Sequence, residues 1–146
     1  MGLSDGAIRL HFNILPDDLT AAGEASSNVK KVLNQLGVNP QFVKKAAIAM
    51  YEAEINAVIH GGGGMADVEI DGEKIVVVIK DEGPGIEDIN LAMQEGYSTA
   101  SDLIREMGFG AGMGLPNMKR YADSLAVESQ VGRGTTVTIM VKISNK

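Results

Sequence analysis

Glycine is the residue type that most constrains how this chain can fold. The 146 residues include 18 glycines, and most of these fall into four clusters, at Gly61–Gly64, Gly83–Gly85, Gly108–Gly114 and Gly132–Gly134. Glycine ends helices and strands and lets other groups approach the backbone, because it has no side chain and adopts conformations that other residues avoid. The clusters therefore mark where regular elements end and where a ligand can come close to the backbone.

The composition is that of a globular protein. Hydrophobic residues make up 45% and charged residues 22% of the chain, and the length predicts one domain over residues 1–146. The net charge of −6 disfavours nucleic acid as a partner, because phosphate binding needs cationic side chains. The chain has no cysteine, which excludes disulfides, thiol catalysis and sulfur-ligated zinc. No apolar run approaches the about 20 residues of a membrane span and the N-terminus does not resemble a signal peptide, so we expect a cytoplasmic protein without membrane contact.

The first 60 residues predict one strand and two helices. Apolar and polar side chains alternate over residues 8–14, which is the pattern of a half-buried strand. Residues 16–18 predict the start of a helix with one apolar face, and Gly37 ends it. Residues 39–40, Asn-Pro, predict the start of a second helix that runs to about His60.

The remaining residues predict mainly strands. Residues 68–70 and 75–79 are expected to form a hairpin, and the second of these strands is apolar at every position, so we expect both its faces to be covered. Further along we expect a short helix over 86–95, a mobile glycine-rich loop over 96–114, a helix over 115–124 and two strands flanking a turn at 132–134. The predicted fold class is α+β, a two-layer sandwich in which helices cover one face of a mostly antiparallel mixed sheet.

A polar pair interrupts the second predicted helix. Glu52 and Asn56 are four residues apart, so their side chains point the same way, between two apolar faces. Because a buried carboxylate without a partner is costly, this stripe should meet a ligand, a cation or water. An acid and an amide oxygen suit Mg²⁺, a hard cation that takes few protein ligands. Taken alone, the pair also fits the solvated edge of an ordinary helix, and we assign no chemistry to His60 one turn further along.

An acidic residue and two glycines follow the apolar strand. Asp81 stands at the strand end, with Gly83 and Gly85 just beyond it. A carboxylate there can accept a hydrogen bond from an exocyclic amine such as that of adenine, and the glycines let a base approach the backbone. The same residues also suit an ordinary turn. The order of all the motifs, rather than this one alone, carries the interpretation.

A longer glycine run precedes the helix predicted over 115–124. Glycines at alternate positions through residues 108–114 expose backbone N–H groups, and the helix N-terminus adds its positive end. This arrangement is an anion cradle, which lets an acidic chain bind a polyphosphate without a basic patch. No parallel βαβ unit surrounds the run and no Gly-Lys-Ser/Thr follows it, so it is neither a dinucleotide fingerprint nor a Walker loop. The last cluster, residues 132–136, also fits a simple hairpin turn.

Taken in order, these motifs resemble the GHKL ATPases, the superfamily that includes the ATP-binding domains of gyrase, Hsp90, histidine kinases and MutL. The motifs are Glu-x-x-x-Asn on a helix, Asp-x-Gly-x-Gly after a strand, a glycine-rich lid entering a helix, and Gly-x-Gly-Thr before a last strand. The segments 52–61, 96–99 and 114–120 are most similar to the bacterial anti-sigma-factor serine/threonine kinases. The resemblance implies the Bergerat-type fold with a flexible lid at about residues 96–114.

The resemblance also implies a role for each matching residue. Glu52 would be the general base, Asn56 would ligate Mg²⁺, and Asp81 would read the adenine amine of ATP or ADP. The lid backbone would hold the phosphates. The other residues expected at the nucleotide are Gly83, Gly85, Gly108, Gly110, Gly112, Met113, Gly114 and Thr135.

The function that the resemblance implies is phosphorylation of a serine or threonine on a partner protein, in an anti-sigma-factor or partner-switch system. The implied partners are a sigma factor, an anti-anti-sigma protein or both, and a second copy of the chain. Some anti-sigma kinases place an arginine just before Gly-Met-Gly, where this chain has Ala111, and Arg105, Lys119 or Arg120 are the candidates to replace that cation. The departure at Ala111 motivates the alternative function, a nucleotide-sensing module that sequesters a regulator without transferring phosphate.

Overall fold

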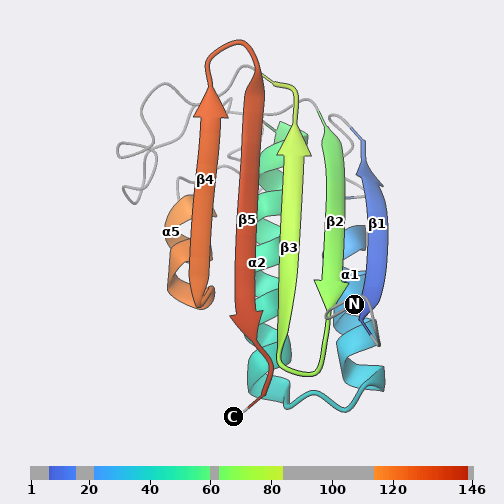
Figure 1. Cartoon of the computed structure of the whole chain (residues 1–146). Helices are drawn as coiled ribbons and strands as arrows, with labels where there is room; N and C mark the ends of the chain where they lie inside the picture. Colours follow the sequence, from blue (N-terminus) through green and yellow to red (C-terminus); the bar gives the residue numbers. More distant parts are fainter. Residues whose placement is uncertain (1–6, 16–21, 60–62, 84–113, 145–146) are drawn as a thin grey trace, which may run out of the picture.

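A computed structural model describes residues 7–15, 22–59, 63–83 and 114–144 of the chain (Figure 1). The elements along these residues are β1 (Ile8–Ile14), α1 (Glu24–Gln35), α2 (Pro40–Ile59), β2 (Gly64–Ile70), β3 (Lys74–Asp81), α5 (Gly114–Tyr121), β4 (Ser124–Gln130) and β5 (Gly134–Lys142). The short helix predicted over 86–95 lies outside the described residues, and so does the loop predicted over 96–114 apart from its last residue.

The described strands form one sheet in the order β1-β2-β3-β5-β4. Each neighbouring pair of these strands is antiparallel, which agrees with the mostly antiparallel sheet predicted from the sequence. At the centre, Val77 of β3 pairs with Val68 of β2 on one side and with Ile139 of β5 on the other. The end of β3 therefore meets the start of β5, and residues far apart in the sequence come together there.

The helices α1, α2 and α5 all lie on one face of the sheet (Figure 1), so the predicted two-layer α+β architecture is confirmed. Alternate strand residues point to this face and form the core with apolar residues of the helices. The largest fully buried side chains are Leu33, Met50, Ile70, Ile75, Ile79, Met118 and Ile139, with the smaller Val29, Val58, Val77 and Val141. Burying each large apolar side chain contributes about 1.5–3 kcal/mol, so this layer supplies the main stabilisation of the fold.

The helix α1 begins at Glu24, so the predicted helix does not continue unbroken through Gly23. Gly23 has a left-handed φ of 96° that a continuous helix cannot accommodate. The predicted start at residues 16–18 lies outside the described residues. The end of α1 is as predicted, since Gly37 follows it with a left-handed φ of 77°. The second helix ends at Ile59, close to the predicted position.

Two further element boundaries differ from the prediction. The strand β2 begins at Gly64, four residues before the predicted start, and pairs along its whole length with β1. The helix α5 ends at Tyr121 and Ser124 already belongs to β4, where it pairs with Met140. In both places the pairing with a neighbouring strand extends the sheet beyond what local propensity indicates.

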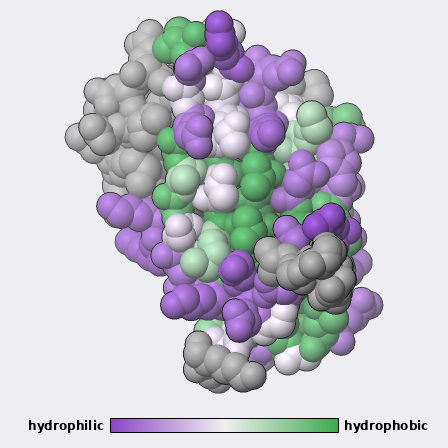
Figure 2. All heavy atoms as spheres, in the orientation of Figure 1, coloured by the Kyte–Doolittle hydropathy of each residue, from purple (hydrophilic) through white to green (hydrophobic). Residues whose placement is uncertain are grey.

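Among the described residues, helices cover only one face of β3, which corrects the expectation that both its faces are covered. Ile75, Val77 and Ile79 point to the helices and are buried, whereas Val76 and Val78 point to the other face and are half-buried. Figure 2 shows this open face, with apolar side chains gathered along its centre and polar ones around them. The strand can be apolar throughout because it lies between β2 and β5, whose side chains flank its outward residues.

Candidate functional site

Asp81 is the last residue of β3, and hydrogen bonds from the backbone hold its carboxylate in place. The Oδ1 atom accepts hydrogen bonds from the N–H of Gly83, 3.0 Å away, and from the N–H of Thr135 in β5, 3.2 Å away. Its Oδ2 atom accepts no hydrogen bond from the described residues. Asp81 is thus a fixed acceptor with one oxygen that the described residues leave free, and such an oxygen can accept a hydrogen bond from an exocyclic amine.

Two glycines on the neighbouring strands allow the backbone to pack closely around Asp81. A Cβ atom at Gly134 would lie 2.1 Å from the carbonyl oxygen of Asp81, and one at Gly64 would lie 2.0 Å from the carbonyl oxygen of Lys80. Gly134 also has a left-handed φ of 107°. A side chain at either position would displace the end of β3. Gly134 of the Gly-x-Gly-Thr motif therefore has a structural role. Because it has no side chain, β5 can lie close enough to β3 for the backbone N–H of Thr135 to hydrogen-bond to Asp81.

A cleft of about 550 Å³ opens at this end of the sheet beside β3, β4 and β5. The hydroxyl groups of Ser129 and Thr135 hydrogen-bond to each other at 2.8 Å, and Ser129 also donates to the carbonyl oxygen of Gly134 at 3.2 Å. The lining residues are Asp81, Val127, Glu128, Ser129, Gln130, Arg133, Gly134, Thr135 and Thr136. The cleft combines a fixed carboxylate with hydroxyl and backbone groups, a polar set that can orient a ligand.

Glu52 and Asn56 lie one turn apart on α2, and both are half-buried. Buried apolar residues lie on either side of them along the helix, as the sequence predicted: Ala49, Met50, Ala53, Ile55 and Ala57. Burial raises the pKa of the Glu52 carboxyl above its usual value, because removing water disfavours the charged form. A raised pKa brings this carboxyl closer to the pH at which a general base is most effective.

Asn117 of α5 contacts Glu52, a contact that the sequence did not indicate. The Nδ2 atom of Asn117 donates a hydrogen bond to Oε2 of Glu52 at 2.7 Å. This hydrogen bond favours the ionised carboxylate, so it lowers the pKa of Glu52 and opposes the larger effect of burial. No periodicity or motif links the two residues, because they lie on separate helices that meet only in the folded chain.

The pair on α2 and the residues around Asp81 lie towards the same end of the fold. In Figure 1 the C-terminal half of α2 rises behind the sheet towards the end of β3 and the start of β5. That half of α2 carries Glu52 and Asn56, and the strand ends carry Asp81 and Thr135. The structure brings Asp81, Gly83 and Thr135 into direct contact. Among the described residues no hydrogen bond joins them to Glu52 or Asn56.

Most of the glycine-rich residues expected at the phosphates lie outside the described part of the chain. These are Gly108, Gly110, Gly112 and Met113, and the same holds for Gly85 and Ala111. Gly114 is the first residue of α5, so the glycine run does enter a helix as predicted. The roles of all these residues at a nucleotide stay predictions.

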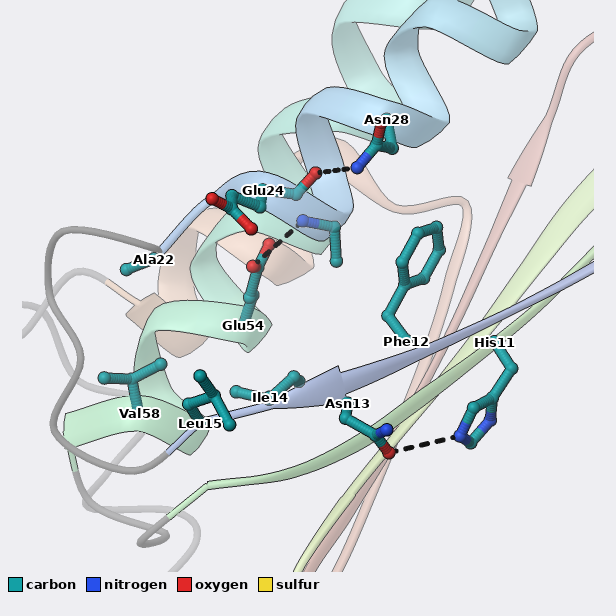
Figure 3. A pocket seen from close by; sticks show the side chains of 11 residues that line it. His11, Phe12, Asn13, Ile14, Leu15, Ala22, Glu24, Asn28, Glu54 and Val58 are labelled. Atoms are coloured by element: carbon teal, nitrogen blue, oxygen red, sulfur yellow. Dashed lines mark hydrogen bonds between the residues drawn. The ribbon is translucent and has the colours of Figure 1, made fainter.

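Glu54, a second carboxylate of α2, has a structural role that the sequence analysis missed. It is 3% exposed and accepts hydrogen bonds of 2.9 to 3.2 Å from the backbone N–H of Gly23, Ala25 and Ser26. Figure 3 shows Glu54 pointing towards the start of α1. The helix α1 has no side-chain cap of its own, so Glu54 satisfies the free N–H groups at its start and lies at the positive end of its dipole. The sequence contained one weak indication that α1 is capped from elsewhere in the chain. Gly23 occupies its N-cap position, where Ser, Thr, Asp or Asn is preferred.

The pocket shown in Figure 3 lies beside this contact and has a volume of about 260 Å³. It lies at the edge of the sheet formed by β1, and its lining includes none of the residues predicted at the nucleotide. Its lining residues are His11, Phe12, Asn13, Ile14, Leu15, Ala22, Glu24, Ala25, Asn28, Glu54 and Val58. The polar groups on Asp81 and Glu52, rather than this pocket, therefore define the candidate site.

The family described as "Histidine kinase-, DNA gyrase B-, and HSP90-like ATPase" matches residues 44–145. The chain belongs to this ATPase family. The match runs from α2 to the end of β5 and so includes Glu52, Asn56, Asp81 and Thr135, and it confirms the resemblance to the GHKL superfamily.

Several curated proteins resemble the chain over most of their length. An anti-sigma F factor of Clostridium kluyveri is 34% identical, over 83% of this chain and 84% of its own. The serine/threonine-protein kinase RsbT of Bacillus subtilis is 30% identical, over 82% of this chain and 85% of its own. An anti-sigma F factor of Thermoanaerobacter pseudethanolicus is 42% identical, over 70% of this chain and 72% of its own. These names agree with the subgroup that the sequence motifs indicated.

Solved structures support the same fold. The RsbU and RsbW domains of a Mycobacterium tuberculosis protein match with a TM-score of 0.62 and 17% identity, over 93% of this chain and 32% of that longer chain. The SiaB-SiaC complex of Pseudomonas aeruginosa matches with a TM-score of 0.56 and 16% identity, over 90% of this chain and 88% of that chain. At these identities the likeness concerns the fold alone. None of the helices in the described residues is long and apolar enough to cross a bilayer.

Proposed function

We propose that this chain binds ATP and transfers its terminal phosphoryl group to a serine or threonine of a partner protein. The observation that carries the proposal is the arrangement at one end of the fold, where Asp81 is a fixed acceptor and Glu52 is a half-buried carboxylate on α2. Membership of the ATPase family supports nucleotide binding, and relatives named anti-sigma F factor and serine/threonine-protein kinase support this reaction class.

Asp81 and Thr135 would bind the base of the nucleotide. The free Oδ2 of Asp81 would accept a hydrogen bond from the exocyclic amine of adenine, while Oδ1 stays engaged by Gly83 and Thr135. The Thr135 hydroxyl, already paired with Ser129, lies beside it and can join the contacts to the base. The backbone N–H groups of the glycine run ending at Gly114 would bind the phosphates.

Asn56 would hold Mg²⁺ through its amide oxygen. Among the described residues no three His, Cys, Asp or Glu side chains gather into a metal site, and in this proposal phosphate and water supply the remaining ligands. That donor set fits Mg²⁺, which takes one or two protein oxygens and keeps phosphate and water as its other ligands. When bound, Mg²⁺ neutralises negative charge on the phosphates.

Glu52 would act as the general base. Its carboxylate accepts the proton of the partner's hydroxyl as the hydroxyl oxygen forms its bond to the terminal phosphorus, and ADP leaves with the bonding electrons. Burial helps this role, because it raises the pKa of Glu52 towards the working pH and removes competing water. The products are the phosphorylated partner, ADP and the protonated Glu52.

The proposed partners are a sigma factor and an anti-anti-sigma protein, by analogy with the relatives named anti-sigma F factor. The anti-anti-sigma protein would carry the serine or threonine acceptor. A second copy of the chain is a further proposed partner, and light scattering of the purified protein would decide whether it dimerises.

The decisive experiment combines the purified chain with labelled Mg-ATP and the protein encoded by the neighbouring gene. We expect label on a serine or threonine of that protein, and loss of at least about a hundredfold in rate with Glu52→Gln, which removes a general base. Titration calorimetry should show that the variant still binds ATP. Equal transfer by both proteins would show that Glu52 is not the base.

A second function is favoured by Ala111, which stands where some anti-sigma kinases have arginine. Without a cation at the terminal phosphate the chain would bind nucleotide and sequester a regulator, with ATP and ADP changing its affinity for that partner. A pull-down whose yield depends on nucleotide, together with no phosphate transfer under any condition, would decide for this function.

A further inference from the structure

The contact between α5 and the proposed base carries a further inference. Asn117 joins Glu52 through a 2.7 Å hydrogen bond from Nδ2 to Oε2. We propose that Asn117 is a positioning residue, which aims the Glu52 carboxylate and holds it in the form that can accept a proton. This inference rests on the proposed function in one respect only, namely that Glu52 acts as a base.

The backbone that carries Asn117 is fixed by its neighbours in the core. Met118, the next residue, is 0% exposed, and Tyr121 and Ala122 pack against the same core. Asn117 itself is half-buried between α5 and α2. A donor on such a rigid support loses little conformational freedom when it forms the hydrogen bond, so it can hold Glu52 in one orientation.

The hydrogen bond uses one oxygen of the carboxylate and leaves the other available. Asn117 engages Oε2, while Oε1 accepts no hydrogen bond from the described residues. Fixing one oxygen restricts rotation of the carboxylate about its last bond, so the direction of Oε1 is also restricted. The proposed geometry is therefore one oxygen held by the protein and one oxygen presented to the substrate hydroxyl.

An uncharged amide is better suited than a cation to orient the Glu52 carboxylate. The other titratable groups next to Glu52 on α2 are Tyr51, whose own pKa is raised by burial and by Glu52 and Glu54, and Glu54, whose oxygens are engaged by α1. On α5, Lys119 and Arg120 are exposed. A lysine or arginine at position 117 would lower the pKa of Glu52 strongly and weaken it as a base, whereas an uncharged amide orients it with a smaller effect.

The contact is tested first by measuring the titration of Glu52 in the nucleotide-free full chain. NMR of the chain with ¹³C-labelled glutamate side chains follows each carboxyl, and Glu52→Gln identifies the resonance. We expect Glu52 to titrate at higher pH in Asn117→Ala, and at still higher pH in Asn117→Asp, which keeps the shape but replaces the donor with a second carboxylate. Asn117→Gln keeps an amide donor and should restore part of the original titration.

The matched control is Asn28→Ala. Asn28 is also an asparagine near the start of a helix, and its Nδ2 donates to the carbonyl oxygen of Glu24 at 2.9 Å, but it lies on α1 away from Glu52. This variant should leave the titration of Glu52 unchanged. If Asn117→Ala does not fold, Asn117→Asp, which has the same shape, carries the test. A Glu52 titration that is identical in the parent and in the folded variants would overturn the inference.

The pH profile of phosphotransfer tests whether the contact matters for the reaction. In Asn117→Ala the acid limb should move to higher pH, with a rate loss on the order of tenfold below that limb and recovery above it. A purely structural role would lower the rate equally at every pH. If the parent chain transfers phosphate and the profile of Asn117→Ala is unshifted, the inference fails alone. If the parent transfers none, the proposed function fails and the NMR titration still judges the contact.

Discussion

The backbone N–H of Thr135 donates a hydrogen bond across the β3–β5 pair to Oδ1 of Asp81, 3.2 Å away. The N–H of Gly83 shares the same oxygen, so the turn after β3 and the start of β5 together orient one carboxylate. The orientation of Asp81 is thus a property of two paired strands and not of its own side chain alone. Any change that separates these strands should weaken nucleotide binding as well as stability.

The first prediction concerns Asp81→Asn. The new Oδ1 can keep both backbone hydrogen bonds, but Nδ2 presents a donor where the adenine amine needs an acceptor. We expect ATP affinity, measured by titration calorimetry, to fall by at least about tenfold, with little change in the unfolding temperature.

The control for Asp81→Asn is Asp71→Asn in the β2–β3 turn. Asp71 also accepts two backbone hydrogen bonds, from Glu73 and Lys74, but it lies at the opposite end of β3. This variant should bind ATP as the parent does. Unchanged affinity in Asp81→Asn would show that Asp81 does not contact the base.

The second prediction compares two effects of adding a side chain near the β4–β5 turn, namely a strained φ alone and a strained φ together with a clash against β3. Gly132 and Gly134 both have a left-handed φ, of 82° and 107°, but only at Gly134 would a Cβ clash, at 2.1 Å from the carbonyl oxygen of Asp81. We expect Gly132→Ala to cost about 1 kcal/mol of unfolding free energy and Gly134→Ala distinctly more, because it adds displacement of β3 to the strained φ. Urea unfolding of the two variants measures this, and equal costs would contradict it.

Local patterns predicted the parts of the fold that depend on neighbouring residues. The alternation over β1 and the apolar run of β3 gave strands, and the spacing of Glu52 and Asn56 put them on one side of a helix. Asp81 was expected at a strand end and is found there. Each of these features follows from residues within a few positions of one another.

The parts that could not be predicted depend on residues that meet only after folding. The start of α1 is held by Glu54, 31 residues after Gly23, and the contact between Asn117 and Glu52 spans 65 residues. The coverage of β3 was also misjudged, because an apolar strand between two others has the same pattern whether one face or both are covered by helices. Periodicity contains no information on such distant partners.

The third prediction concerns Glu54→Gln at the start of α1. The variant keeps one acceptor oxygen but turns an NH₂ group towards backbone N–H donors, so at least one hydrogen bond is lost and the charge at the helix dipole disappears. We expect a loss of about 2–4 kcal/mol in unfolding free energy, measured with urea. Amide exchange at Ala25 and Ser26 should accelerate.

The control for Glu54→Gln is Glu24→Gln. Glu24 lies in the first turn of the same helix but is exposed. Its replacement should change the unfolding free energy by less than about 0.5 kcal/mol. Similar losses for the two variants would mean that the helix dipole, and not the buried hydrogen bonds of Glu54, accounts for the effect.

The last prediction concerns stability in acid and depends on Asp123. Its Oδ2 accepts a hydrogen bond from the backbone N–H of Lys142 at 2.7 Å, and its Oδ1 lies 3.1 Å from Nζ of Lys45. The hydrogen bond from Lys142 first, and Lys45 less, lower the pKa of Asp123 below its usual value of 3.8. The folded chain thus binds this proton less readily than the unfolded chain, so the stabilisation is full above that value and is lost as the pH falls through the lowered pKa.

We therefore expect Asp123→Asn to reduce the unfolding free energy at pH 7 by less than about 1 kcal/mol, because the two side chains are still 28–33% exposed and water screens the pair. As the pH falls below 3.8 and through the lowered pKa of Asp123, the difference from the parent should shrink, since the parent then becomes protonated and both chains carry an uncharged group at this position. Lys45→Ala should also reduce the unfolding free energy at pH 7, but by less than Asp123→Asn does, because Lys45 lowers the pKa of Asp123 less than the hydrogen bond from Lys142 does. A difference that stays constant from pH 7 down to the acid transition would mean that Asp123 stabilises the chain through its shape and not through its charge.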